Sequence, residues 1–182
     1  MNLHEYLTSH NEANSALLLD EAKLAAIVET LSLCINSSGT IWTAGNGGSA
    51  STASHLTCDL AKGVSLARQS GVKSFCLNDN MSINTAWAND FSYEVALERQ
   101  LEIYAVPGDI FIAFSGSGES PNIINALNAA KRMGIKSIAL LGFEGGRAVD
   151  IADLSIVIRS NDMQVVENLH MVISHWIFKA LH

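Results

Sequence analysis

A histidine and an aspartate four residues apart follow a glycine-rich turn. The stretch 41–63, IWTAGNGGSASTASHLTCDLAKG, begins as an apolar β-branched run, turns at Gly47 and Gly48, and continues as an Ala/Ser/Thr run. A strand, a glycine turn and a helix N-terminus in that order form an anion site, because unpaired N–H groups point at the ligand. His55 and Asp59 share one face of the helix that follows. We predict a phosphate cradle with acid–base chemistry beside it.

A second turn of glycine and serine follows another apolar run, IFIAF, at residues 110–114. Its sequence is SGSGES, and Ser115, Ser117 and Ser120 offer three hydroxyls to the oxygens of one phosphate. Pro121 suits the first position of a helix, so ordinary capping by Ser117 or Ser120 is the alternative. The sequence lacks the GxGxxG and GxxxxGK[ST] spacings of nucleotide-binding loops, and we predict no nucleotide cofactor.

The last helical stretch, 163–181, carries an acid and two histidines. Glu167 and His175 are eight residues apart, so that the helical step lets both face one cleft, two turns apart. His170 falls on a different face. A lone histidine in an apolar helix is more often structural, so His175 gains a chemical role only from the residues placed opposite it.

Composition narrows the class of protein. The 182 residues suit one domain, 1–182, and with 48% hydrophobic and 16% charged residues the chain is not disordered. A net charge of −7 argues against a nucleic-acid-binding surface. No apolar run is long enough to span a membrane. The N-terminus does not resemble a signal peptide. Cys34, Cys58 and Cys76 form no CxxC pair, and we expect each to be a small buried residue in a reducing cytoplasm.

Strands and helices are predicted to alternate. Continuous apolar runs predict buried parallel strands, and the helices between them cover both faces of the sheet. We therefore expect an α/β fold, a three-layer α/β/α sandwich with a five-stranded parallel sheet of flavodoxin-like type. The predicted strands are 40–44, 73–77, 110–114, 136–142 and 154–158. The predicted helices are 3–35, a helix from the first turn to about residue 63, 81–88, 93–104, 121–133, a short helix after Gly146, and 163–181.

The N-terminal helical region, residues 1–36, is unusually apolar. It carries apolar residues at helical spacing without an interrupting proline or glycine. We predict that this region is used in oligomerisation, and packing within the domain core is the alternative.

Taken together, GNGGSA, the His/acid pair, SGSGES-PN and the final Glu-x-x-His-x-x-x-x-His resemble the sugar isomerase (SIS) domain family. The likeness covers nearly the whole chain. It is strongest to the branch that interconverts sedoheptulose 7-phosphate and D-glycero-D-manno-heptose 7-phosphate for lipopolysaccharide or surface polysaccharide synthesis. That branch implies a homotetramer with active sites between subunits, and zinc in some members.

The resemblance also assigns roles. It implies that Asp59 and His175 are catalytic. It implies a zinc site made by His55, Asp59, Glu167 and His175. The residues that it places at the phosphosugar are Asn46, Gly47, Gly48, Ser49, Asp90, Ser115, Gly116, Ser117, Ser120 and Glu167.

Several positions depart from the usual pattern of that branch. Asp59 stands where glutamate is usual, Glu167 where glutamine is usual, and Gly63 where arginine is usual. Gly116 and Met163 both stand where threonine is common. These departures leave open an isomerase of another phosphosugar. A second alternative is a non-catalytic phosphosugar-binding or regulatory SIS protein, of the kind that associates with a replication initiator.

Overall fold

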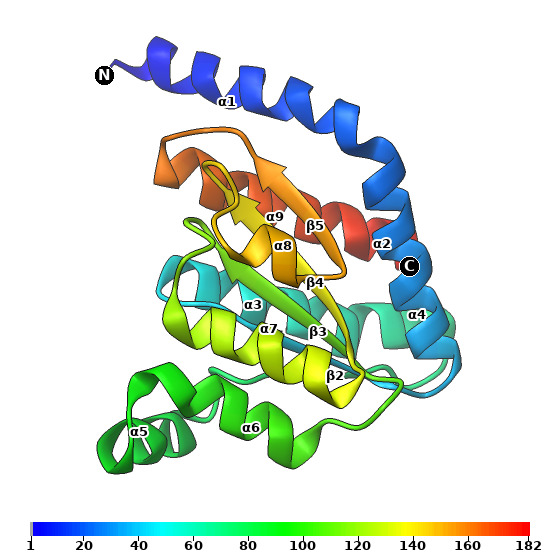
Figure 1. Ribbon diagram of the computed structural model, residues 1–182. Coiled ribbons are helices and arrows are strands. Elements are labelled where there is room, and N and C mark those ends of the chain that lie inside the picture. Colours follow the sequence, from blue (N-terminus) through cyan, green and yellow to red (C-terminus); the bar gives the residue numbers. More distant parts are fainter. Residues whose placement is uncertain (1) are drawn as a thin grey trace.

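The computed structural model of the chain describes residues 2–182 and has the predicted α/β architecture. Its five strands form one parallel sheet in the order β2-β1-β3-β4-β5 (Figure 1). The strands are β1 (Thr40–Ala44), β2 (Lys73–Cys76), β3 (Ile110–Ser115), β4 (Lys136–Gly142) and β5 (Leu154–Ile158). The sheet order reverses direction between β1 and β3, so ligands are expected at the carboxyl ends of these two strands.

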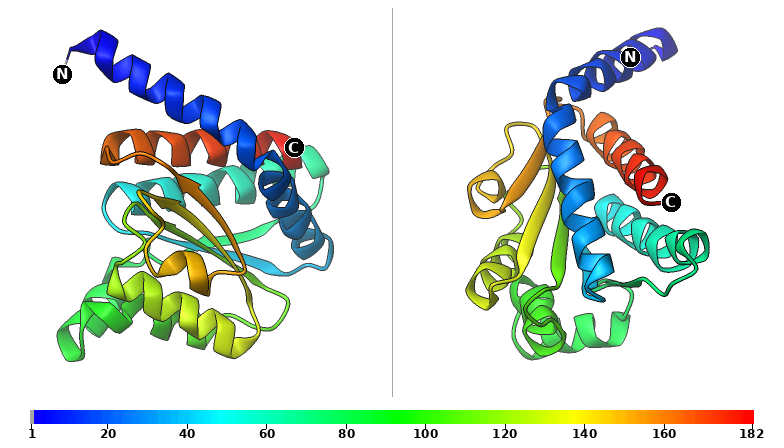
Figure 2. Two further views of the ribbon diagram at one scale, coloured as in Figure 1. Left: turned by 45° about the horizontal axis from the view of Figure 1, so that its top comes forward. Right: turned by 90° about the vertical axis from the view of Figure 1, so that its right-hand side faces the viewer.

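Helices cover both faces of the sheet, and the edge-on view in Figure 2 separates the two layers. One face is covered by α2 (Glu21–Asn36), α3 (Gly48–Cys58) and α9 (Met163–Leu181). The other face is covered by α6 (Ala96–Tyr104), α7 (Pro121–Met133) and α8 (Ala148–Ile151). The remaining elements are α1 (Leu3–Leu17), η1 (Leu18–Asp20), the π-helix η2 (Asp59–Val64), α4 (Ser65–Arg68), α5 (Met81–Asp90) and η3 (Tyr93–Val95).

The central strand β3 explains why the sheet needs both layers. Every residue of β3 is buried. Ile110, Ile112 and Phe114 pack under α2, α3 and α9, whereas Phe111 and Ala113 pack under α6 and α7. Successive side chains of a strand point to opposite faces, so a continuous apolar run fits a strand that is covered twice.

The N-terminal region behaves as two parts rather than as the one predicted helix. Helix α1 has no buried residue and extends past the body of the molecule (Figure 2), and the 3₁₀ turn η1 separates it from α2. Helix α2 buries Ile27, Leu31, Cys34 and Ile35 against the sheet. Packing within the core therefore explains the apolar residues of α2. The prediction of a role in oligomerisation now concerns α1.

Two predictions of helix boundaries and one prediction of burial were wrong. The helix from the first turn does not end near Gly63 but continues through η2 and α4 to Arg68. Helix α5 is not broken at Asn89 but runs to Asp90 and ends at Phe91, whose φ of −132° and ψ of −91° leave the helical region. Cys58 is exposed rather than buried, because it lies on the face of α3 away from the sheet.

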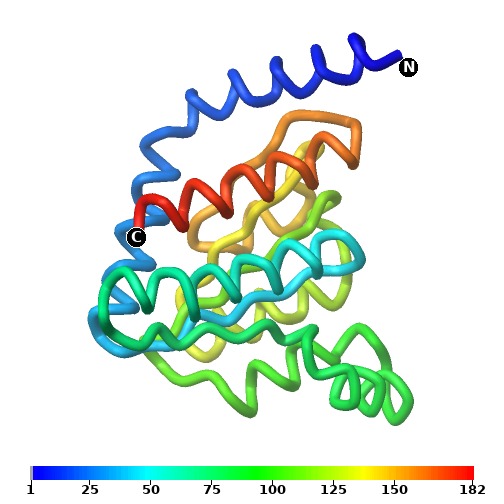
Figure 3. Tube along the Cα trace, turned by 180° about the vertical axis from the view of Figure 1, so that it is seen from behind, coloured from blue at the N-terminus to red at the C-terminus, as the bar shows by residue number. Residues whose placement is uncertain are grey.

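Helices α3 and α9 lie side by side and run in the same direction across the back of the sheet (Figure 3). Because they are parallel, their N-termini meet at the same edge of the sheet as the carboxyl ends of β1 and β3. The two glycine turns and the two helices that carry the histidines and acids are thereby brought together.

Candidate active site

The two glycine turns line one hollow of about 270 Å³, which we call the serine pocket. They are neighbours because β1 and β3 are paired, with Ala44 beside Ala113 at their carboxyl ends. The lining residues are Asn46, Gly47, Gly48, Ser49, Phe114, Ser115, Gly116, Ser117, Ser120, Met163 and Glu167. All of the residues predicted at the phosphosugar are present except Asp90.

Helix N-termini make the serine pocket attractive to an anion. Helices α3 and α7 both begin at it, and within the described chain neither N-cap residue, Gly47 or Ser120, makes a side-chain capping bond. Helix α9 also begins there, but the carboxylate of Asp162 accepts bonds from the N–H groups of Gln164 and Val165. Two helix starts therefore keep donors and positive dipole ends for a ligand.

The serine hydroxyls hold the second turn in shape. Ser115 Oγ accepts a bond from the N–H of Gly118 at 3.1 Å, and Ser117 Oγ accepts one from Glu119 at 3.2 Å. In both cases the oxygen acts as acceptor, so the hydroxyl proton stays available to a ligand. Ser120 occupies the N-cap position of α7, yet its side chain does not cap the helix in the described structure. Ordinary capping therefore does not explain the three serines.

Glu167 closes one side of the serine pocket. Its carboxylate lies so close to Gly48 that a Cβ at that position would overlap both oxygens. The glycine of the first turn thus makes room for a side chain from a helix 119 residues later in the sequence. A carboxylate here can accept hydrogen bonds from hydroxyl groups of a ligand.

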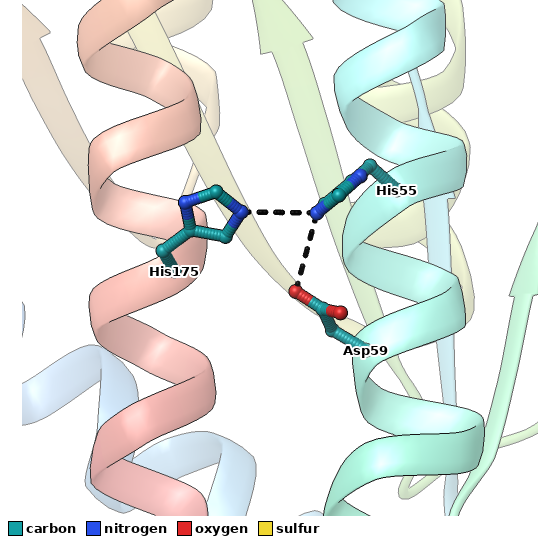
Figure 4. A group of neighbouring side chains, drawn as sticks. All are labelled: His55, Asp59 and His175. Carbon is teal, nitrogen blue, oxygen red and sulfur yellow. Dashed lines mark hydrogen bonds and ion pairs between the residues drawn. The ribbon is translucent and has the colours of Figure 1, made fainter.

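Further along the same two helices, His55, Asp59 and His175 converge (Figure 4). His55 Nε2 lies 3.0 Å from His175 Nε2 and 3.4 Å from Asp59 Oδ2. Both imidazoles are exposed and the carboxylate is half-buried. We call these three residues the histidine–aspartate group. It leaves a base, an acid and a hydrogen-bonding partner open to a substrate.

The histidine–aspartate group also suits a divalent metal. One ligand atom from each residue lies within 4.8 Å of the others. Nitrogens bound to one tetrahedral zinc ion are roughly 3.3 Å apart, close to the spacing of the two imidazoles. Three protein ligands with an open fourth position are typical of catalytic zinc. Glu167 does not join this group in the described part of the chain, because its carboxylate lies against Gly48.

A polar network on the far side of the serine pocket was missed by sequence reasoning. Asn46 and Asn122 exchange two side-chain bonds of 2.9 and 2.8 Å, and Tyr93 donates its hydroxyl proton to Asn46 Oδ1 at 2.7 Å. Asn122 belongs to the SGSGES-PN motif and could have been found from it. No spacing links Tyr93 to Asn46, 47 residues away.

Two other residues lie away from both groups. Asp90 is exposed at the end of α5, where it accepts a bond from Asn89, and it does not line the serine pocket. His170 is fully buried between α9 and the sheet, and its Nε2 lies 3.1 Å from the carbonyl oxygen of Leu141 in β4. Burial lowers the pKa of His170 to about 4.

The unusual residues Gly116 and Met163 are in contact. The sulfur of Met163 occupies the space that a Cβ at position 116 would need, and Phe143 lies just beyond. The absence of a side chain at Gly116 therefore makes room for Met163. The result is an apolar wall at a place where threonine hydroxyls are common in the family that the sequence resembles.

Comparison with known proteins agrees with this architecture. Residues 5–142 match the model of the SIS domain family, so the chain belongs to that family. A protein of Thermoplasma acidophilum named as a probable phosphoheptose isomerase is 34% identical over 165 residues, which cover 91% of this chain and 90% of that protein. The phosphoheptose isomerase of Geotalea daltonii is 37% identical over 153 residues, covering 84% and 79%.

A solved structure extends the comparison of folds. The phosphoheptose isomerase of Neisseria gonorrhoeae superposes with a TM-score of 0.86 at 24% identity, over 99% of this chain and 98% of that one. The whole chain, including α9, which lies beyond the residues matched by the family model, therefore has the fold of that structure.

Proposed function

We propose that the protein is an aldose–ketose isomerase that converts sedoheptulose 7-phosphate to D-glycero-D-manno-heptose 7-phosphate. One observation carries this proposal: the serine pocket and the histidine–aspartate group lie along the same pair of helices. Gly48 and His55 are seven residues apart on α3, a rise of about 10 Å. An extended seven-carbon sugar phosphate has a comparable length, so its phosphate and its reacting carbons can occupy the two places together.

The reaction moves a proton between neighbouring carbons. In our assignment the carboxylate of Asp59 takes a proton from carbon 1, and the imidazole of His175 gives one to the oxygen on carbon 2. The product is an enediol. Asp59 then returns the proton that it took from carbon 1 to carbon 2, and loss of the proton on the carbon 1 oxygen gives the aldose.

Other residues bind and orient the substrate. The serine hydroxyls and the free N–H groups of α3 and α7 hold the phosphate, and Asn46 and Glu167 face the sugar hydroxyls. Binding the remote phosphate positions the reacting carbons and contributes to catalysis through orientation.

Zinc is an alternative to direct proton transfer by Asp59 and His175, because these two residues would then serve as metal ligands. His55, Asp59 and His175 would hold it, with Glu167 as a fourth ligand only if its side chain turns away from Gly48. When bound, zinc polarises a carbonyl oxygen and stabilises the negative charge that develops on it.

The described chain also supports a proposal about assembly. Leu3, Leu7 and Leu18 of the N-terminal region are each more than half exposed, and Trp176 of α9 is partly exposed in the hollow that Leu18 lines. We propose a homotetramer that covers these side chains and brings Asp90 of one subunit to the serine pocket of another. Size-exclusion chromatography with light scattering measures that state.

We place the reaction in the cytoplasm, where phosphorylated sugars are made. The three cysteines are free thiols, which a reducing compartment preserves. No helix in residues 2–182 has both the length and the apolar character needed to cross a bilayer.

The contact between Gly116 and Met163 favours one second candidate, an isomerase of another phosphosugar. The thioether of Met163 beside Gly116 offers a ligand no hydroxyl to donate or accept a strong hydrogen bond. A sugar with fewer or differently placed hydroxyl groups fits such a wall better.

A substrate panel tests the proposal. Ketose and aldose phosphates of five, six and seven carbons are assayed for isomerisation, with and without a chelator. We expect the highest kcat/KM with sedoheptulose 7-phosphate. Asp59→Asn removes the base with little change in shape, and we expect turnover to fall roughly 10²–10⁴-fold.

The other outcomes each decide between the alternatives. Turnover of a different sugar with an inert heptulose phosphate would establish the second candidate. A rise in melting temperature with phosphosugars, but turnover of none, would identify a binding protein. Unchanged turnover in Asp59→Asn would remove Asp59 from the mechanism.

A further inference from the structure

The helix that carries His55 changes its pitch at Asp59. Helix α3 ends at Cys58, and the six residues Asp59–Val64 form the π-helix η2 before regular helix resumes in α4. A π-helix is wider than an α-helix, is rare, and occurs mostly within α-helices at functional sites. The wider turn begins at the carboxylate of the histidine–aspartate group, so it affects the direction in which that carboxylate points.

One contact joins η2 to α9. The ring of Phe178 packs directly on Gly63, where a Cβ would lie 2.5 Å from Cε2, 3.1 Å from Cζ and 3.4 Å from Cδ2. Cβ atoms essentially never approach another heavy atom closer than 3.0 Å, so only glycine permits this approach. Leu60 and Val64 of the same turn are fully buried against the core, which fixes η2 from the other side.

This contact is in register with the histidine–aspartate group. Gly63 follows Asp59 by four residues and Phe178 follows His175 by three, so each pair lies on neighbouring turns of one helix. The ring and the glycine therefore meet about one turn beyond the place where His175 meets His55 and Asp59. A change in the spacing of the helices at Gly63 must change the spacing at Asp59 as well, because packed helices move as stiff units.

We propose that Gly63 and Phe178 are positioning residues that set the separation of η2 and α9 and so aim Asp59 and His175 at the same point. Neither side chain enters the serine pocket or the histidine–aspartate group. The role of the two residues in setting the helix separation does not depend on the proposed function. Their role in proton transfer rests on that function.

Three variants test the proposal in the full-length protein. Gly63→Ala places a methyl group where the ring now lies, so the ring must move, and we expect it to push α9 away from η2. Gly63→Ala with Phe178→Leu removes the two ring atoms nearest to that methyl group and lets the helices return. Phe178→Ala removes the contact without overpacking. The matched control is Gly71→Ala, because a Cβ at Gly71 meets nothing within 4 Å.

The readouts separate positioning from folding. For Gly63→Ala we expect kcat with sedoheptulose 7-phosphate to fall roughly 10- to 100-fold while KM stays within about twofold, because the serine pocket is remote. We expect the double variant to recover most of kcat. Imidazole ¹⁵N NMR of metal-free protein at one pH is expected to show shifted signals for His55 and His175 in Gly63→Ala and Phe178→Ala. The signal of the distant His4 serves as reference.

The results that would overturn the proposal are distinct from failure of the proposed function. Unchanged His55 and His175 signals in both single variants would overturn it, as would a double variant that recovers neither these signals nor kcat. If Gly63→Ala does not fold, Phe178→Ala decides alone. If the wild type does not isomerise the heptulose phosphate, the proposed function fails, and the NMR comparison still tests the positioning.

Discussion

The two ends of the α3–α9 pair are built in different ways. At the serine pocket, backbone N–H groups and short hydroxyl side chains come from loops that directly follow two paired strands. At the histidine–aspartate group, three long side chains come from helices and meet across 120 residues of sequence. The pocket is thus fixed by the sheet, and the group depends on how two helices pack. Binding and catalysis should therefore respond to different substitutions.

The largest effect is expected at the histidine–aspartate group. His175→Ala removes the proposed acid, and we expect kcat to fall roughly 10²–10⁴-fold with KM nearly unchanged. Initial rates with sedoheptulose 7-phosphate measure both constants. His4→Ala, an exposed histidine on α1, is the control. If KM rose by the same factor as kcat fell, binding and catalysis would not be separated between the serine pocket and the histidine–aspartate group.

A stability effect is expected from the opposite face of α9. The pKa of His170 is about 4 in the folded protein against 6.5 ordinarily, so between these values the unfolded chain binds a proton that the folded chain does not. The free energy of unfolding should fall as the pH is lowered from 6.5 toward 4, by up to about 3 kcal/mol. Urea unfolding across this range measures it.

His170→Asn is expected to flatten that dependence. The variant lacks the titrating imidazole, so its slope of stability against pH should be shallower, while kcat and KM at neutral pH change little. An unchanged slope would show that other groups dominate the pH dependence of stability. A large loss of kcat would show that His170 contributes to catalysis.

A smaller effect is expected on metal binding, which should depend on the histidine–aspartate group and not on the serine pocket. His55→Ala removes a proposed ligand and is expected to weaken Co²⁺ binding by at least roughly 100-fold, the upper end of what loss of a residue that only supports a ligand causes, whereas Ser120→Ala should leave it unchanged. The visible absorption of bound Co²⁺ measures both affinities. Equal weakening in the two variants would mean that the ion does not bind at the histidine–aspartate group.

The smallest effect is expected at the serine pocket. Ser120→Ala removes one hydroxyl of several donors to the phosphate, and one hydrogen bond to a charged group contributes about 1.5–3 kcal/mol. Because the other donors remain, we expect an effect near the low end of this range, a rise in KM of roughly 10- to 15-fold with kcat retained. Ser38→Ala, a serine beyond the far ends of the strands, serves as control. A fall in kcat alone would contradict a purely binding role.

The sequence predicted the pocket better than it predicted the helix pairing. Strands β1, β4 and β5 fall at the predicted residues, because continuous apolar runs between polar turns leave little choice of boundary. The two turns then meet because parallel strands end at one edge. Local signals sufficed for this half of the site.

Long-range packing supplied what the sequence did not predict. The π-helix at Asp59 has no local signature, and the contact of Gly63 with Phe178 depends on the separation of two helices. The pairing of Gly116 with Met163 was visible only as two separate departures from a family pattern. Cys58 was misjudged because residue type alone does not tell which face of α3 is covered.

The position of α9 bears on how members of this family can differ. The family match ends at residue 142, so it contains strands β1 to β4, both glycine turns and α3, but not β5, Glu167 or His175. The match that shows the family therefore leaves out the helix that carries both of these residues. The final nineteen-residue helix adds the second half of the reacting group. Substitutions confined to α9 can therefore change the histidine–aspartate group while the sequence of both glycine turns stays the same.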